Sequence, residues 1–195
     1  MQKIWKIFLL FICISLLLNS YDLRRKDNLF SKIQSTYINE DWLSAEKLLN
    51  EYLATETNPD RCWVAWYKLI DISERMRIDN NIILNYLNNM YNDYASYKDK
   101  KKFILYKIAN IKENKSIIEA IEAWEDYLFK NKLSQDELFV VYKKLSKLYY
   151  RAENYDSLEE ILENCLSLDV IDPKLIFCKL NLAEFYSVKT EFDMA

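Results

Sequence analysis

The sequence predicts an all-α protein: an α-solenoid of about five antiparallel helix pairs, preceded by an N-terminal hydrophobic targeting helix. Three observations support this prediction. The 195 residues include no glycine, which the tight turns of a β-rich fold need at positive φ and which helices do without. Apolar residues recur at helical spacing in stretches of roughly 12 to 18 residues. These stretches form pairs that repeat at a nearly constant interval.

The interval separates the residues that are expected to open the second helix of each pair. Its steps are 37, 38, 38 and 37 residues, between Trp42, Asp79, Ile117, Tyr155 and Phe192. Such regularity indicates a solenoid, in which each helix pair buries its apolar face only against its neighbours. Asparagine is expected in left-handed turn positions in place of glycine. We expect helices over 26–38, 41–54, 60–76, 79–96, 100–112, 116–130, 135–151, 155–169 and 172–189, and from 191 onward.

Composition argues against most kinds of enzyme. Without glycine there is no phosphate-binding loop, dinucleotide fingerprint or nucleophile elbow, and without histidine there is no imidazole base or ligand. We therefore expect no catalytic residues, no metal site, no cofactor and no small-molecule substrate. The net charge of −3 argues against nucleic-acid binding. A carboxylate-dependent enzyme is the remaining catalytic alternative, although Glu160 and Glu163, on one helical face, are expected to be solvated.

Residues 1–20 form an apolar segment with a positive start, which is typical of a signal peptide or a signal anchor. We interpret it as membrane-targeting and residues 21–195 as the helical-repeat domain. A buried first helix of a soluble protein is the alternative. The expected location is membrane-anchored or exported, and extracytoplasmic, in a periplasm or cell envelope. The targeting residues are Lys3, Lys6, Ile7, Phe8, Leu9, Leu10, Phe11, Leu16, Leu17 and Leu18.

Three cysteines lie outside the apolar segment: Cys62, Cys165 and Cys178. Their spacing does not suit a metal site. Consecutive helices bring Cys165 near Cys178, so a disulfide is conceivable, but a role as small buried apolar residues is favoured. On this interpretation the cysteines do not decide the compartment.

Particular residues resemble the tetratricopeptide repeat, whose first helix carries an aromatic, a leucine, a small residue and a tyrosine at fixed spacing. The pattern is matched from residue 28 to residue 195, most closely in the first, fourth and fifth copies. The period is longer than the family's, glycine is absent, and Ile70 stands where a small residue is expected. A HEAT-like array is the alternative solenoid. The matching residues are Trp42, Ala45 and Leu49, then Trp66 and Leu69, then Ala120 and Trp124, then Tyr142, Leu145, Ser146, Tyr149, Leu158, Leu162 and Cys165, and finally Leu182, Ala183, Tyr186, Phe192 and Ala195.

The resemblance implies that first helices line a concave groove, where clamp-type members of the family hold a partner's carboxylate with Lys and Asn. Lys143, Lys147 and Arg151 recur every fourth residue along one first helix and form a basic stripe there. Their Asn companion is missing, and an ordinary solvated face is the alternative. With Tyr150 they form the predicted partner-binding set.

The sequence thus predicts a non-catalytic scaffold or adaptor of the cell envelope that binds a peptide or helix of a protein partner. The alternative is a structural subunit of an envelope assembly or translocation complex. The segment Glu191–Ala195 looks like a second helix that has only begun. We therefore expect a truncated repeat domain or an end that docks on something else.

Overall fold

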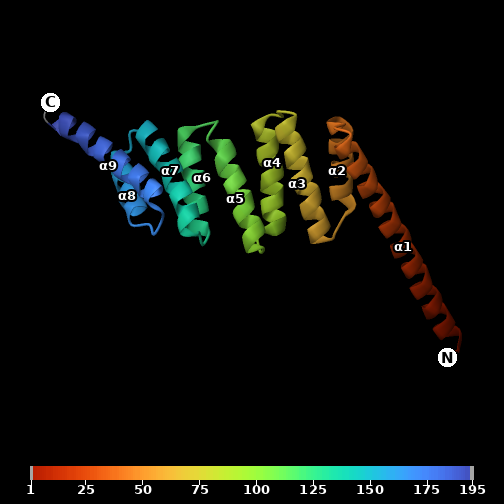
Figure 1. Cartoon of the computed structure of the whole chain (residues 1–195). Helices are drawn as coiled ribbons and strands as arrows, with labels where there is room; N and C mark the ends of the chain where they lie inside the picture. Colours follow the sequence, from red (N-terminus) through yellow and green to blue (C-terminus); the bar gives the residue numbers. More distant parts are fainter. Residues whose placement is uncertain (1, 194–195) are drawn as a thin grey trace. The chain divides into compact units, whose positions relative to one another are not determined.

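The chain folds into α-helices, as the sequence predicts. The computed structural model describes the backbone of residues 2–193 and the side chains of residues 12, 14–18, 20–171 and 173–187. Within this part there are nine helices and no strand (Figure 1). They are α1 (Gln2–Ile38), α2 (Trp42–Thr55), α3 (Pro59–Arg75), α4 (Asn80–Tyr94), α5 (Lys98–Lys112), α6 (Ile117–Lys130), α7 (Gln135–Arg151), α8 (Tyr155–Leu166) and α9 (Asp172–Asp193).

Most helix starts follow from local capping. α2, α6 and α8 begin at the predicted residues, and α4 begins one residue after the predicted Asp79. The side chain of Asp41 accepts a hydrogen bond from the backbone N–H of Ser44, and that of Asn154 accepts one from Ser157. Each bond satisfies an N–H group that the first turn of a helix leaves unpaired. Capping therefore fixes where α2 and α8 begin, whereas the side chain of Ser116 makes no such bond at the start of α6.

Two predicted breaks are wrong. The helix expected from residue 26 is the second part of α1, which runs without interruption from Gln2 to Ile38. The helix expected from residue 191 does not exist as a separate element, because α9 continues through Phe192 to Asp193. No glycine or proline lies between residues 174 and 193, so nothing in the backbone chemistry ends α9. Within residues 2–193 the chain thus has four helix pairs and one further helix.

The chain forms two compact units, Met1–Tyr86 and Leu87–Ala195, with the division inside α4. In each unit, helices that follow one another in sequence pack together: α1 to α3 in the first and α5 to α9 in the second. The core of the first unit contains Ile33, Ala45, Leu49, Tyr52, Ala65, Leu69 and Ile72. The core of the second unit includes Ala109, Ala120, Trp124, Leu145, Leu158 and Leu162. Packing in sequence order makes each unit solenoid-like.

Polar contacts between alternate helices repeat at about the length of one helix pair. Arg61 of α3 pairs with Asp27 of α1 at 2.8 Å, over a separation of 34 residues. Lys102 of α5 pairs with Glu137 of α7 at 2.6 Å, over a separation of 35 residues. Lys174 of α9 pairs with Asp136 of α7 across 38 residues. Within each unit, alternate helices therefore lie side by side, as the predicted interval requires.

Three helices end in the same left-handed turn. Glu40, Arg77 and Glu153 have φ values of 59°, 53° and 55°, and they are separated by one and then by two repeat intervals. After α7, the N–H of Glu153 donates to the carbonyl of Tyr150 and the N–H of Asn154 to that of Tyr149. This is the Schellman motif, whose left-handed position usually holds glycine. The expected asparagine is absent from all three positions. Charged residues occupy them and adopt the left-handed conformation instead.

Replacing Glu153 by glycine should stabilise the protein. A Cβ atom at positive φ costs about 1–2 kcal/mol, and the extra backbone freedom of glycine offsets about 0.5–1 kcal/mol of the gain. We expect Glu153→Gly to raise the free energy of unfolding by about 0.5–1 kcal/mol, measured by urea denaturation. Glu153→Ala keeps the Cβ atom and serves as the control. An equal gain in both variants would show that backbone strain is not the cause.

Candidate functional site

The predicted partner-binding residues lie on the exposed face of α7. A capping box starts this helix: the Ser134 side chain accepts from the N–H of Glu137, and the Glu137 side chain accepts from the N–H of Ser134. The opposite face buries Phe139, Val141, Leu145, Ser146, Leu148 and Tyr149. Residues spaced by three or four positions share one side of a helix. The burial of one face therefore turns Lys147, Tyr150 and Arg151 toward solvent and leaves Lys143 half-buried.

The four predicted residues differ in what they contact. Lys143 is half-buried, and its ammonium group lies 5.0 Å from the centre of the Phe177 ring of α9. Tyr150 is 53% exposed, and Lys147 and Arg151 are also exposed. Among the described residues, the charged groups of Lys147 and Arg151 make no ion pair or hydrogen bond. We call these two residues the basic ridge.

The basic ridge separates two hollows in the second unit. The α7–α9 hollow, of about 320 Å³, is lined by Lys147, Tyr150 and Arg151, by Leu158 and Leu162 of α8, and by Asn181, Glu184 and Phe185 of α9. The α5–α7 hollow, of about 520 Å³, is lined by Lys143, Lys144 and the basic ridge, with Glu113 and Asn114 opposite. Both volumes suit side chains of a ligand. Because Lys147 and Arg151 line both hollows, they can contact a ligand in either.

Lys144, unlike Lys147 and Arg151, is paired within the described part of the protein and is therefore not free to bind a ligand. Its ammonium group pairs with Glu113 at 2.8 Å, and the same carboxylate accepts a hydrogen bond from the indole N–H of Trp124 at 2.7 Å. Trp124 is fully buried. The Lys144–Glu113–Trp124 contact therefore holds α5, α6 and α7 together, and it leaves Lys144 with a structural partner.

Two tyrosines connect first helices to the second helices before them. The Tyr149 hydroxyl donates to Glu125 at 2.6 Å, and the Tyr186 hydroxyl donates to Glu159 at 2.7 Å. Burial first, and then the bond to Glu125, raise the pKa of Tyr149. Both tyrosines occupy the tyrosine position of the repeat pattern. Their hydroxyl groups stay neutral at physiological pH and fix the orientation of α7 and α9.

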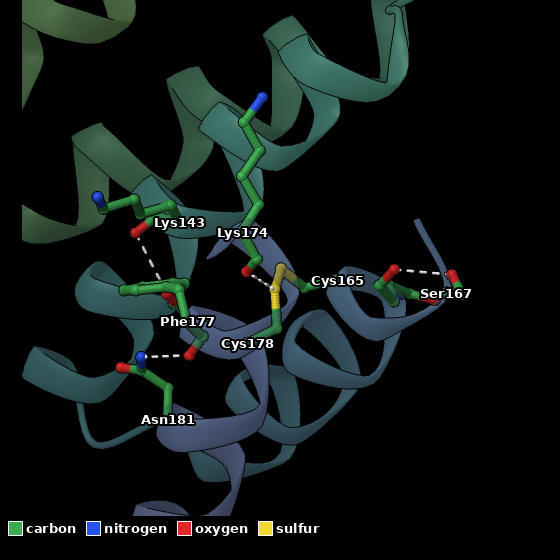
Figure 2. Close-up of a disulfide and its surroundings, with 9 residues drawn as sticks. Lys143, Cys165, Ser167, Lys174, Phe177, Cys178 and Asn181 are labelled. Atoms are coloured by element: carbon green, nitrogen blue, oxygen red, sulfur yellow. Dashed lines mark hydrogen bonds between the residues drawn. A yellow bond between two sulfur atoms is a disulfide. The ribbon is translucent and has the colours of Figure 1, made fainter. Parts of the chain in front are cut away.

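Sequence reasoning missed the contribution of neighbouring repeats. Asn114 and Asn181 bring amide groups to the two hollows, although no asparagine accompanies the lysines on α7 itself. Asn181 stands one repeat interval after Lys143 in the sequence. Its side-chain amide donates to the carbonyl of Phe177 at 2.7 Å (Figure 2). Aligning each first helix with the next could have found this residue.

A disulfide joins the end of α8 to the start of α9. Cys165 and Cys178 are bonded, with Cα atoms 5.9 Å apart, and their side chains are 1% and 0% exposed. The favoured interpretation, two buried thiols, is therefore wrong about their chemical state and correct about their burial. Figure 2 places the bond beside Phe177, the ring that Lys143 contacts. The disulfide thus holds α9 where it lines the α7–α9 hollow.

Removing the disulfide should destabilise the second unit. The bond closes a loop of 13 residues by sequence separation, and closing a loop of that size contributes about 3 kcal/mol. We expect Cys165→Ala/Cys178→Ala to lower the free energy of unfolding by about 2–4 kcal/mol in denaturant titrations. Cys62→Ala, with no disulfide to lose, is the control. Equal stability of the double variant and the native chain would contradict the assignment.

The N-terminal part of α1 is apolar and exposed where its side chains are described. Leu16, Leu17 and Leu18 all face solvent, and Leu17 is 68% exposed. The side chains of the other targeting residues lie outside the described residues: Lys3, Lys6, Ile7, Phe8, Leu9, Leu10 and Phe11. In the part of the chain that was described, no helix combines the length and apolarity needed to cross a membrane. No group of three or more potential metal ligands occurs among the described residues either.

Helices that pack in sequence order define a solenoid-like all-α protein. Neither protein-family models nor curated protein sequences match the chain. Among solved structures, it is similar to the crystal structure of BtubC (BKLC) from P. vanneervenii, with a TM-score of 0.55 and 18% sequence identity. The match covers 85% of this chain and 73% of that chain. At this identity, the similarity concerns the fold alone.

Proposed function

We propose that the chain is a non-catalytic scaffold that binds a peptide or helical segment of another protein along α7. The observation that carries this proposal is the basic ridge: Lys147 and Arg151 are exposed, without ion pairs among the described residues, and line hollows on both sides. Positive charge that no described carboxylate of the chain neutralises attracts acidic segments and fixes their position. The hollows supply apolar contact beside that charge.

The tetratricopeptide resemblance supports the same assignment. In that family the first helix of each pair lines the binding groove, and α5, α7 and α9 are the first helices of their pairs. The two hollows lie between these helices. Asn114 and Asn181 add the amide groups that α7 lacks. An acidic or carboxylate-bearing segment is therefore the class of ligand that we propose.

We also propose that the protein is attached to a membrane through α1 and lies outside the cytoplasm. The exposed leucines at residues 16–18 support attachment, because an apolar helix surface gains free energy on entering lipid. The disulfide supports an oxidising compartment, such as a periplasm or cell envelope, because cytosolic thiols are kept reduced.

A second candidate function is a structural subunit of an envelope assembly, held by broad surfaces. Its support is the outer face of α6, where Ile118 and Phe129 lie about three helical turns apart on one side of the helix. Phe129 is 81% exposed and Ile118 is also exposed. A partner subunit that covers this face of α6 would bury both side chains. This surface is distinct from the basic ridge.

Site-specific crosslinking should distinguish these two functions. A photoreactive phenylalanine analogue replaces Tyr150 in one variant and Phe129 in another, both in the full chain in native membranes. We expect partner crosslinks from position 150 that fall at least about fivefold when Lys147→Glu and Arg151→Glu are added. Crosslinked bands on denaturing gels are the measurement.

Charge reversal at Lys47 and Lys132, both exposed, is the matched control and should leave these crosslinks unchanged. Circular dichroism checks that helicity is retained. Crosslinks from position 129 that persist while those from position 150 are absent would favour the structural subunit. Crosslinks from position 150 that are unchanged by the charge reversals at Lys147 and Arg151 would contradict the proposed binding along α7.

Membrane attachment through α1 predicts that the exposed leucines drive vesicle binding. Leu17→Asp replaces an apolar contact with a charge, and the lost burial of one leucine lowers partitioning by about tenfold or more. Flotation of the full chain with phospholipid vesicles measures the bound fraction. Leu43→Asp makes the same change at another exposed leucine, on α2. If both variants float like the native chain, α1 is not the attachment element.

A further inference from the structure

A third hollow lies between α5 and α7, near the first turns of both helices. Its volume is about 530 Å³. Its walls are apolar and aromatic: Phe103 and Tyr106 come from α5, Tyr127 from α6, and Val140 and Val141 from α7. We call it the aromatic hollow. It is separate from the basic ridge but adjoins the α5–α7 hollow, because Val140 lines both.

The rings around this hollow pack edge to face. Tyr106 and Tyr127 have centroids 5.6 Å apart, and Trp124 lies behind both, at 5.5 Å from Tyr106 and 5.8 Å from Tyr127. Burial raises the pKa of Tyr127 to about 12, so its phenol stays neutral. Tyr106 is 37% exposed, so part of its ring is accessible to a ligand. Neutral aromatic faces attract cations as well as apolar groups.

The rim of the aromatic hollow is acidic. Asp99, Asp136 and Glu137 line it together with a single lysine, Lys102. Lys102 pairs with Glu137 at 2.6 Å, which lowers the pKa of that carboxyl, and Asp136 pairs with Lys174. Among the described residues, the carboxylate of Asp99 makes no ion pair. Of the described residues that line the rim, Asp99 is therefore the acidic residue whose carboxylate makes no ion pair with another described residue.

The two ends of the α5–α7 face carry opposite charge. Along α7, Glu137 at the aromatic hollow lies about three helical turns before Lys147 and about four before Arg151. At a rise of about 1.5 Å per residue these separations are about 15 and 21 Å. An extended peptide covers such a span with about five or six residues. A ligand that matches both ends must itself be positive at one end and negative at the other.

We propose that the aromatic hollow holds the side chain of a lysine or arginine from an extended partner segment, whose acidic residues lie about five residues away on the basic ridge. This inference rests on the proposed function and names its ligand class. The aliphatic part of the side chain contacts Val140 and Tyr106, and its charge meets Asp99. Matching both charges fixes the position of the segment along α7.

Three labelled peptides of equal length test the inference with the full-length chain. The first carries a lysine about five residues from two glutamates, the second has norleucine in place of the lysine, and the third has the lysine next to the glutamates. Fluorescence anisotropy gives the Kd of each. We expect the first peptide to bind about two- to fivefold more tightly than the other two, the range of an exposed cation–aromatic contact.

Asp99→Asn should reduce the difference between the lysine and norleucine peptides, because the aromatic walls remain but the carboxylate is lost. Glu122→Gln, on the exposed side of α6, should preserve the full difference. Equal affinity of these two peptides in the native chain would overturn the inference. If Lys147→Glu then still weakens both, the proposed function survives that failure. If no peptide depends on Lys147 or Arg151, or none binds at millimolar concentration, the proposed function and the inference fall together.

Discussion

The constraint on which this structure depends is that each helix buries its apolar side against helices close to it in sequence. In both units the packed pairs are successive helices, and ion pairs connect α1 to α3, α5 to α7 and α7 to α9. Such packing leaves a long exposed strip on the alternate helices, because no distant part of the same unit folds over it. The basic ridge and the three hollows of the second unit lie on that strip. The proposed binding role therefore follows from how the fold is stabilised.

Features that depend on a few adjacent residues were predictable from sequence. The starts of α2 and α8 follow from capping residues and apolar spacing, that of α6 follows from apolar spacing alone, and α7 has the predicted bounds. The continuity of α1 and α9 was harder to predict, because neither predicted break contains a glycine or proline that would end a helix. The left-handed turns occur at the repeat interval, yet their occupants are Glu40, Arg77 and Glu153. The hydrogen bonds of the turn, not the residue type, select that conformation.

The candidate site was only partly predictable, for a related reason. Helical spacing placed Lys147, Tyr150 and Arg151 on one exposed face, where the structure also has them. The same spacing could not show that Lys143 lies over Phe177, or that Asn181 lines the neighbouring hollow. These contacts join residues about one repeat apart, and they depend on how α9 packs on α7. The disulfide also depends on helix packing, because Cys165 and Cys178 can form a bond only when the turn between α8 and α9 brings them together.

That covalent link also bears on how the second unit fluctuates. In an array of nearest-neighbour contacts, helices detach in small groups, and each detachment exposes its own amide protons to solvent exchange. The bond between Cys165 and Cys178 prevents α9 from sliding along α8 or peeling away from it alone at its first turns. Motions that open this end of α9 must therefore carry the end of α8 with them. The covalent bond therefore couples the two helices at this end, and a widening of the α7–α9 hollow there requires their joint displacement.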